Sequence, residues 1–321
     1  MVKKLKIYRS SSFNPYENLA TESLLLESVD CDTVILYLWQ NDNTVVIGKN
    51  QNPLIECKVD LIDKENVFIA RRSSGGGAVF HDKGNLNFTF IAQNENYNLE
   101  KQMQIIKKAC DFANISTEIS GRNDIVVNGK KISGNAFLNT KKSSLHHGTL
   151  LINSNIENIS RYLSPNLSKL QSKGIKSVES RITNLTRFTP NLTCEDMCSH
   201  LIKAAEEIYN LKSEKILNTS LKEIEKLKNI YSSKEYIYGA LIPYTITFSK
   251  RLSFGNLDLR ISLKGKTINE IQAFTDSLDT NLPEKIKKVL EGSLYELEEI
   301  KRRLNTVFPT EISKEIYEMF L

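Results

Sequence analysis

The sequence predicts an α+β protein with a large mixed-sheet domain and a small C-terminal α/β domain. Apolar runs of strand length alternate with amphipathic helical segments through the first 152 residues, which is typical of a sheet covered by helices. A polar, weakly periodic stretch follows at 164–190, and further strands and helices come after the Gly- and Pro-bearing segment 239–243. Because 321 residues suit two domains, we expect one domain over 1–241 and a second over 242–321.

The first domain is expected to begin with a helix over 14–29, because Asn14 is a good N-cap and Pro15 is tolerated at the first helical position. The dipeptide Asn128-Gly129 between two apolar runs indicates a hairpin with a type I′ turn. Apolar spacing predicts the other elements of this part: strands at 33–39, 44–47, 67–70, 78–80, 86–92, 125–127, 131–132 and 147–152, and a second helix at 99–113.

The rest of the chain is expected to contain a long ordered loop over 164–190, bounded by Pro165 and Pro190, and then more regular structure. The expected helices are 193–209, 221–230 and about 283–291, 293–304 and 310–320, and the expected strands are 257–263 and 268–274.

Composition excludes several classes of protein. With 40% hydrophobic and 25% charged residues the chain has the make-up of a globular protein, and no run approaches the roughly 18 apolar residues of a membrane span. The basic N-terminus has no apolar run behind it, so we expect a cytoplasmic protein. The net charge of +5 is spread along the chain, unlike the basic stripe of a nucleic-acid binder.

The first segment with a chemical signature is RRSSGGGAVFHDKGNLNFTF, residues 71–90. Three consecutive glycines remove every Cβ from a loop that enters a strand, so that backbone N–H groups can approach a ligand closely. Two preceding arginines add cationic donors suited to phosphate or carboxylate. A bare triple glycine is equally consistent with a flexible turn, but the flanking arginines and the Phe-His-Asp that follows favour a binding loop.

The second segment is GRNDIVVNGKKISGNAF, residues 121–137. The hairpin can direct a lysine ammonium into the mouth of a pocket, although paired lysines after a turn ordinarily face solvent. Gly134, near the lysines on the same strand, favours close approach of a ligand or of another backbone. Neither segment matches the P-loop or the G-x-G-x-x-G pattern, so a nucleotide would have to be bound by another architecture.

These two segments resemble the lipoate–protein ligase family, in the order and at the spacing of that family. The resemblance continues in HHGTLLIN (146–153), KGIKSVESRITNL (173–185), YIYG (236–239), RLSFGNLDLRI (251–261) and QAFTDSL (272–278), the last three being similar to the accessory domain of two-domain ligases. It implies a catalytic domain of the biotin/lipoate ligase type, and an enzyme that activates lipoate with ATP and Mg²⁺ to lipoyl-AMP. It further implies a monomer that transfers the lipoyl group to a lysine of an apo lipoyl domain, in an E2 subunit or in glycine cleavage H protein.

The resemblance also implies roles for individual residues. Lys131, favoured over Lys130 because it directly precedes Ile-Ser-Gly, would be the catalytic residue and contact both the lipoate carboxyl and ATP. Asp124, in an Asn-Asp pair with Asn123, would contact magnesium or phosphate. The expected ATP-binding residues are Arg72, Gly77, Ala78, Val79, Phe80 and Lys131, and the expected lipoate-binding residues are Lys131, Arg71, Ser73, His81 and His147. His146 is expected to be a hydrogen-bonded neighbour outside the pocket, and Trp39 a core residue of its strand.

Three other functions remain open from the sequence. An octanoyl or lipoyl acyltransferase on the same fold would work without ATP through a cysteine thioester, but the segment 135–137 after Gly134 holds no cysteine. A non-catalytic lipoyl- or biotin-type sensor would not need Lys131, and a biotin ligase would have a different glycine loop. The five cysteines are scattered and are expected to be reduced thiols.

Overall fold

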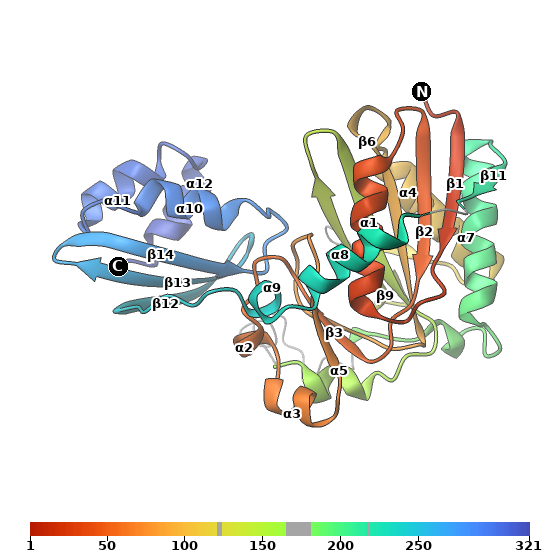
Figure 1. The fold of residues 1–321 in the computed structure, drawn as a ribbon, viewed down its shortest axis with the longest axis horizontal. Coiled ribbons are helices and arrows are strands. Elements are labelled where there is room, and N and C mark those ends of the chain that lie inside the picture. The colour runs from red at the N-terminus through yellow and green to blue at the C-terminus, as the bar shows by residue number, and fades with distance from the viewer. Residues whose placement is uncertain (121–123, 165–180, 217–218) are drawn as a thin grey trace.

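The computed structural model describes residues 1–120, 124–164, 181–216 and 219–321. Figure 1 shows a large domain that carries the N-terminus and a smaller one that carries the C-terminus, each built of a sheet with helices. The α+β class predicted from the sequence is confirmed. Within the described residues, no helix is both long and apolar enough to cross a membrane.

The large domain is organised around an eight-stranded mixed sheet with the order β11-β1-β2-β6-β10-β9-β8-β7. Strand β1 is parallel to β2 and β11, and the other neighbours are antiparallel. The strands are β1 (Lys4–Arg9), β2 (Thr33–Trp39), β6 (Asn85–Gln93), β7 (Glu118–Ser120), β8 (Asp124–Val127), β9 (Lys130–Asn139), β10 (Ser143–Leu151) and β11 (Ser213–Lys215).

Helices cover both faces of this sheet. Strand β2 alternates: Val34, Leu36 and Leu38 pack with helices α4 (Leu99–Phe112) and α7 (Cys194–Tyr209), while Ile35, Tyr37 and Trp39 pack with α1 (Pro15–Ser28). Helix α8 (Leu221–Tyr231) lies against α1 on that second face (Figure 1). Asn14 caps α1 as expected, its side chain accepting from the backbone N–H groups of Tyr16 and Glu17.

A smaller three-stranded sheet, of order β4-β3-β5, adjoins the main sheet and carries the glycine segment. Its strands are β3 (Thr44–Ile47), β4 (Phe68–Arg71) and β5 (Val79–His81). The short elements around it are α2 (Pro53–Glu56), α3 (Val59–Lys64), η1 (Asn94–Asn96), α5 (Glu157–Tyr162), η3 (Leu185–Arg187) and α9 (Lys234–Tyr238). Most of the loop expected at 164–190 lies outside the described residues.

The C-terminal domain has its own core. Its strands are β12 (Ile246–Leu252), β13 (Gly255–Lys264) and β14 (Thr267–Thr275), and its helices are α10 (Leu282–Leu290), α11 (Leu297–Leu304) and α12 (Thr310–Tyr317). The apolar residues buried here pack with one another and form a cluster drawn entirely from 252–320. Each domain therefore buries its own hydrophobic residues.

The two domains meet where the segment 275–280 reaches the large domain. The Thr275 N–H donates to the Asn50 carbonyl at 2.9 Å, and Asn50 Nδ2 donates to the Thr280 carbonyl at 3.0 Å. The Gly76 N–H donates to the Ser277 carbonyl at 3.2 Å. A Cβ on Gly75 would lie 2.3 Å from that same carbonyl oxygen, so the contact requires glycine. The glycine segment is thus packed directly against the C-terminal domain.

Candidate active site

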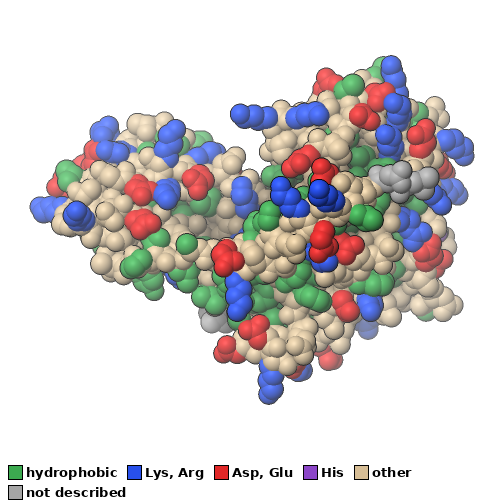
Figure 2. Space-filling model, in the orientation of Figure 1, with side chains coloured by type: hydrophobic (Ala, Val, Ile, Leu, Met, Phe, Trp, Pro, Cys, Tyr) green, Lys and Arg blue, Asp and Glu red, His purple; other side chains and the backbone are tan. Residues whose placement is uncertain are grey.

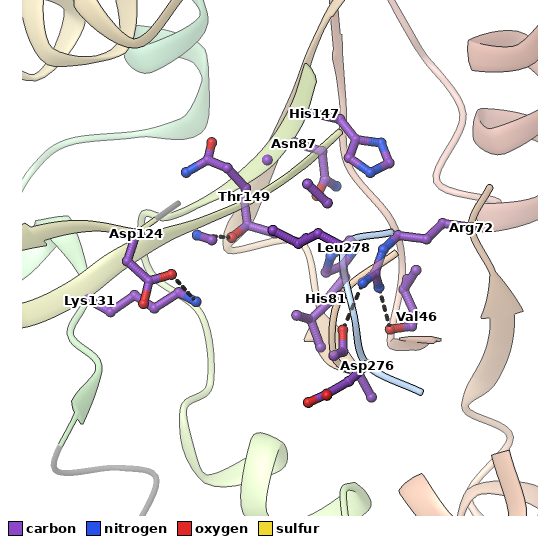
Figure 3. Close-up of a pocket in the computed structure, with 18 of the residues that line it drawn as sticks. Val46, Arg72, His81, Asn87, Asp124, Lys131, His147, Thr149, Asp276 and Leu278 are labelled. Carbon is purple, nitrogen blue, oxygen red and sulfur yellow. Dashed lines mark hydrogen bonds and ion pairs between the residues drawn. The ribbon is translucent and has the colours of Figure 1, made fainter. Parts of the chain in front are cut away.

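A cavity of about 420 Å³ lies between the main sheet, the glycine segment and the C-terminal domain (Figure 3). Its walls come from both domains. The lining residues are Leu19, Trp39, Val46, Arg72, Gly76, Gly77, Ala78, Val79, His81, Asn87, Asp124, Lys131, Gly134, Asn135, Ala136, His147, Gly148, Thr149, Arg181, Arg251, Asp276 and Leu278.

Side chains alternate between the two faces of the sheet along each strand, and this determines which of them face the cavity. In β6, Leu86, Phe88 and Phe90 turn toward the α4/α7 core, so Asn87 lies on the opposite, cavity face. In β10, His147 and Thr149 lie on the cavity face for the same reason. Asn87, His147 and Thr149 therefore line the cavity from positions that alternate with core-facing residues.

His146 lies on the other face of β10, as expected from the sequence. Its Nδ1 is 3.1 Å from Gln102 Oε1 and its Nε2 is 2.8 Å from Asn135 Oδ1. Complete burial lowers the pKa of His146 to about 3, which keeps the ring neutral.

Arg72 holds the glycine segment in place. The buried guanidinium donates to the carbonyls of Gly75 and Gly77 at 2.7 and 2.8 Å, and to the Val46 carbonyl at 3.2 Å. Burial lowers the pKa of Arg72 to about 10, so the group stays cationic at neutral pH. Gly76 has a φ of 90°, which side-chain-bearing residues rarely adopt. The segment therefore presents a buried cation and a glycine backbone to the cavity.

The hairpin brings Lys131 into the cavity opposite this segment. Asn128 and Gly129 have φ values of 49° and 73°, which confirms the type I′ turn. Lys131 Nζ lies 2.7 Å from Asp124 Oδ1, and both side chains are about one-third exposed, at 36% and 37% (Figure 3). Lys130 is exposed and does not line the cavity. The type I′ turn and the pairing of β8 with β9 therefore direct Lys131, rather than Lys130, toward the cavity.

A buried hydrogen-bond chain forms the wall next to the glycine segment. His147 Nε2 is 2.6 Å from Ser74 Oγ, and His147 Nδ1 is 2.9 Å from Glu22 Oε1. Thr89 Oγ1 donates to Glu22 Oε1 at 2.7 Å and accepts from Trp39 Nε1 at 3.1 Å. Both ring nitrogens of His147 and the indole N–H of Trp39 therefore have hydrogen-bond partners within the protein.

Most residues singled out from the sequence line one cavity, and three do not. The lining set includes Arg72, Gly77, Ala78, Val79, His81, Asp124, Lys131 and His147. Arg71, Ser73 and Phe80 are absent from it, and Asn123 lies outside the described residues. Phe80 stacks on Tyr162 in the core of the small sheet.

Arg71 points away from the cavity because successive side chains of a strand face opposite sides. Its guanidinium donates to backbone carbonyls of the loop 48–51 and of α9, including Gln51 at 2.8 Å and Tyr236 at 3.0 Å. The placement of Arg71 against lipoate expected from the sequence is therefore not seen. In this structure the residue joins the glycine segment to the end of α9.

Sequence reasoning missed several cavity residues. Trp39 is buried as expected, yet it also lines the cavity. Asn87 could have been found, because an Asn between Leu and Phe in a strand breaks an apolar run on one face only. Asp276 and Arg251 come from the second domain; both lie in segments that resemble the accessory domain, but nothing in the sequence placed them at this site. Arg251 Nη1 lies 3.2 Å from both Asp276 carboxylate oxygens.

No cysteine is among the residues that line the cavity. Burial raises the pKa of Cys57, Cys110 and Cys194 to about 12 and that of Cys198 to about 11. A nucleophilic thiolate needs the opposite shift, so these four thiols are unsuited to covalent catalysis.

The fold and the cavity agree with one class of protein, the lipoyl ligases. Residues 14–206 match the family model of the lipoyl protein ligase A/B catalytic domain. Residues 242–319 match the C-terminus of bacterial lipoate protein ligases. The chain therefore belongs to the lipoate–protein ligase family and has both parts of its two-domain members.

Individual proteins agree with this assignment. The chain is 38% identical over 312 residues to lipoate-protein ligase A of Psychrobacter cryohalolentis, covering 94% of this chain and 92% of that protein. The crystal structure of P. falciparum LipL1 in complex with lipoate is 32% identical, with a TM-score of 0.84 and 98% of each chain covered.

Two more distant structures share the fold. Lipoate-protein ligase A bound with ATP is 23% identical, with a TM-score of 0.64 over 75% of this chain and all of that chain. A bipartite lipoate protein ligase described with its E2 lipoyl domain, from Thermoplasma acidophilum, is 24% identical, with a TM-score of 0.64 over 77% of this chain and all of that chain.

Proposed function

We propose that this protein is an ATP-dependent lipoate–protein ligase. It joins the lipoate carboxylate to the α-phosphorus of ATP, releasing pyrophosphate, and then transfers the lipoyl group from lipoyl-AMP to a lysine amine of an acceptor protein. The observation that supports this most directly is the make-up of the cavity that Lys131 and the glycine segment share. One part is cationic and rich in glycine backbone, as an adenylate requires, and another part is walled by Leu19, Trp39 and Val46, as an apolar acyl chain requires.

Lys131 is the proposed catalytic residue of the first half-reaction. A carboxylate oxygen that approaches the α-phosphate brings two anions together, and the departing pyrophosphate gains charge, so a fixed cation lowers the barrier. The Lys131 ammonium is a compact point charge on a hairpin strand, with its Nζ 2.7 Å from Asp124 Oδ1. Phosphate oxygens would replace that carboxylate as its partner.

The glycine segment is the proposed site of the nucleotide. Arg72 and the backbone of Gly77, Ala78, Val79 and Phe80 would bind the phosphates and the adenylate, with Arg72 acting from its buried position. Glycine leaves room beside the backbone for the mixed anhydride between the acyl group and AMP.

Asp124 is the proposed contact for Mg²⁺. Its carboxylate lines the cavity and is partly exposed, and Mg²⁺ favours one or two carboxylates together with substrate phosphates. When bound, the ion would offset charge on the triphosphate.

In the second half-reaction the acceptor amine forms a bond to the acyl carbon and the acyl–phosphate bond breaks, releasing AMP. Lys131 would stabilise the oxyanion that forms or the phosphate that departs. The lipoyl chain would lie along Trp39 with His81 and His147, and the sequence-based proposal of Ser73 rests on the resemblance alone.

The proposed acceptor is an apo lipoyl domain, from an E2 subunit or from glycine cleavage H protein. Residues 1–241 would activate and transfer lipoate, and 242–321 would act as an accessory domain that closes the cavity with Leu278.

Figure 2 shows Lys/Arg and Asp/Glu side chains interspersed over both domains on the face drawn, rather than a basic stripe. The cytoplasmic location and the monomeric state stay predictions.

The deciding experiment combines the protein, ATP, lipoate and an apo lipoyl domain and weighs the acceptor by mass spectrometry. We expect a mass increase of one lipoyl group that requires ATP, with AMP and pyrophosphate as products. Transfer from a thioester donor without ATP would indicate the acyltransferase instead, and binding of lipoate without any transfer would indicate a sensor.

A further inference from the structure

Both domains contribute charge to the cavity. Among the described residues that line it, cationic side chains outnumber carboxylates: Arg72, Lys131, Arg181 and Arg251 against Asp124 and Asp276. Arg251 and Asp276 belong to the C-terminal domain, and the others to the large domain. A cavity with this balance of charge suits a polyanion such as the triphosphate of ATP.

Arg251 is held in place by a fixed carboxylate. Its Nη1 lies 3.2 Å from both carboxylate oxygens of Asp276 and 3.1 Å from Asn256 Oδ1. Asp276 Oδ1 in turn accepts from the Asn256 N–H at 2.6 Å. A Cβ on Gly255, whose φ is 152°, would lie 2.6 Å from the same oxygen, so the carboxylate packs closely against this turn. The C-terminal domain therefore orients Arg251 through its own residues.

Arg251 also keeps donors for a ligand. A guanidinium has five N–H groups, and the Nη1 atom of Arg251 carries two of them. Its Nε and Nη2 make no hydrogen bond to the described part of the chain, and the arginine is the more exposed member of the pair, at 37% against 5% for Asp276. In the buried Arg72, by contrast, every guanidinium nitrogen already donates to a side chain or a backbone carbonyl of the protein.

The ion pair of Arg251 lies next to the glycine segment. Ser277, which follows Asp276 in the chain, accepts from the Gly76 N–H at 3.2 Å. Figure 3 shows Asp276 apart from Lys131, which is proposed for the α-phosphate and the lipoate carboxyl. The cavity therefore has an ion pair from each domain, at separate positions along its wall.

We propose that Arg251 binds the β- and γ-phosphates of ATP and stabilises the pyrophosphate as it departs. This inference rests on the proposed ligase function and adds a catalytic cation from the C-terminal domain to the first half-reaction. A planar guanidinium can donate to two phosphate oxygens at once, which suits it to this group better than an ammonium. Negative charge grows on the pyrophosphate as the carboxylate oxygen bonds to the α-phosphorus, so a fixed cation there lowers the barrier.

The two half-reactions should depend on Arg251 to different degrees. Lipoyl-AMP retains only the α-phosphate of ATP, so the group that Arg251 binds has left before the acceptor amine reacts. Loss of the guanidinium should therefore impair adenylation and its reversal but not acyl transfer. A residue that only shaped the cavity would affect both half-reactions.

The test measures the reverse of adenylation, in which pyrophosphate and lipoyl-AMP give ATP and lipoate. We expect Arg251→Gln to raise the KM for pyrophosphate roughly tenfold or more, because charge-assisted hydrogen bonds are lost. Arg251→Lys keeps the charge without the planar fork and should lie between Arg251→Gln and the wild type. In both variants, transfer from supplied lipoyl-AMP to an apo lipoyl domain should be unchanged.

Lys250→Gln is the matched control. Lys250 precedes Arg251 in β12 and pairs with Glu318, and it is not among the described residues that line the cavity. Its replacement should leave the KM for pyrophosphate unaltered.

A wild-type KM for pyrophosphate in Arg251→Gln would overturn the proposal. Equal losses of pyrophosphorolysis and acyl transfer in both Arg251 variants would also overturn it, because Arg251 would then shape the cavity rather than bind pyrophosphate. Failure of the wild type to form lipoyl-AMP from lipoate and ATP would instead contradict the ligase function on which the proposal rests.

Discussion

At the scale of single residues, the site depends on Lys131 being directed inward by a two-residue turn. Its ion pair with Asp124 is about one-third exposed on both sides, so it contributes only about 0–1 kcal/mol to stability. The lysine can therefore be removed with little effect on the fold, and loss of activity in its variants reports on chemistry.

We expect Lys131→Ala to reduce lipoyl-AMP formation by roughly 100- to 1000-fold, because a preorganised cation at the α-phosphate is lost. Adenylate formation is measured by pyrophosphate release, and the melting temperature checks the fold. Lys130→Ala is the matched control: the neighbouring side chain is exposed and should lose far less. Near-normal adenylate production by Lys131→Ala would contradict the assignment.

Two buried histidines predict how stability depends on pH. The pKa of both His81 and His146 is lowered to about 3 by burial, against about 6.5 in the unfolded chain. Below pH 6.5 the unfolded state therefore binds more protons, and stability falls as the pH drops toward 3. At pH 5 each histidine should lower the free energy of unfolding by about 2 kcal/mol relative to neutral pH.

Urea unfolding at pH 7.5, 6 and 5 measures this dependence. His146→Gln removes one titrating ring and should make the stability curve less steep between pH 6.5 and 5. A curve that keeps its full slope in this variant would show that His146 is not held neutral by burial.

At the scale of elements, local pattern predicted the strands that are apolar over most of their length and the helices that are capped. Strand β2 and helix α1 were found within a residue or so, because β2 is apolar on both faces and Asn14 and Pro15 mark the start of α1. Strand β1 was missed although Leu5 and Ile7 are buried, because its intervening lysines gave the segment a polar appearance. Strand β12 is mostly exposed, and its apolar alternation of Ile246, Phe248 and Leu252 is interrupted by Lys250.

The site was predictable only where it lies within one segment. The glycine loop and the hairpin stand out in the sequence because their composition is unusual for packing alone. Asp276 and Arg251 reach the cavity through tertiary contacts between domains, and Glu22 reaches His147 across 125 positions. Local sequence patterns cannot reveal such pairs, because no residue near Glu22 in the sequence marks it as the partner of a cavity histidine.

The glycine loop should not tolerate a branched side chain at position 76. Gly76 has a φ of 90°, and a Cβ there would lie 3.0 Å from Arg72 Nη2. We expect Gly76→Val to raise the apparent KM for ATP roughly tenfold or more, because the cation and the backbone that are proposed to bind phosphate would both move.

Gly265→Val is the control for backbone strain alone. Gly265 also has a positive φ, of 62°, but an added Cβ would meet nothing within 4 Å and the turn lies in the C-terminal domain. It should lower stability while leaving the ATP dependence unchanged. An unaltered KM for ATP in Gly76→Val would show that this loop does not contact the nucleotide.

At the scale of the whole molecule, five cysteines are distributed without relation to the cavity. We expect a variant with all five replaced by serine or alanine to keep ATP-dependent ligation, and to lose about 1–3 kcal/mol of stability from its buried positions. Acceptor mass and adenylate formation are measured on the same folded sample. A variant that makes the adenylate but no longer transfers the acyl group would require a thioester mechanism.

The interface between the domains sets a geometric condition on the second half-reaction. Leu278 and Asp276 of the C-terminal domain line the cavity, while the 275–280 segment is held by backbone bonds to Asn50 and Gly76. In the proposed reaction an acceptor lysine has to reach the acyl carbon inside this cavity. We therefore expect the C-terminal domain to move away once the adenylate has formed, since single-chain domain contacts of this kind usually permit motion.

Small-angle scattering with and without a non-hydrolysable lipoyl-adenylate measures this movement, and we expect a larger radius of gyration in the bound state. Asn50→Ala removes the side-chain bond to the Thr280 carbonyl and should shift the free protein part of the way toward the same curve. Lys130→Ala leaves the interface untouched and should scatter like the wild type in both states. Identical curves for the free and the bound protein would mean that the acceptor enters by a route that does not require the C-terminal domain to leave.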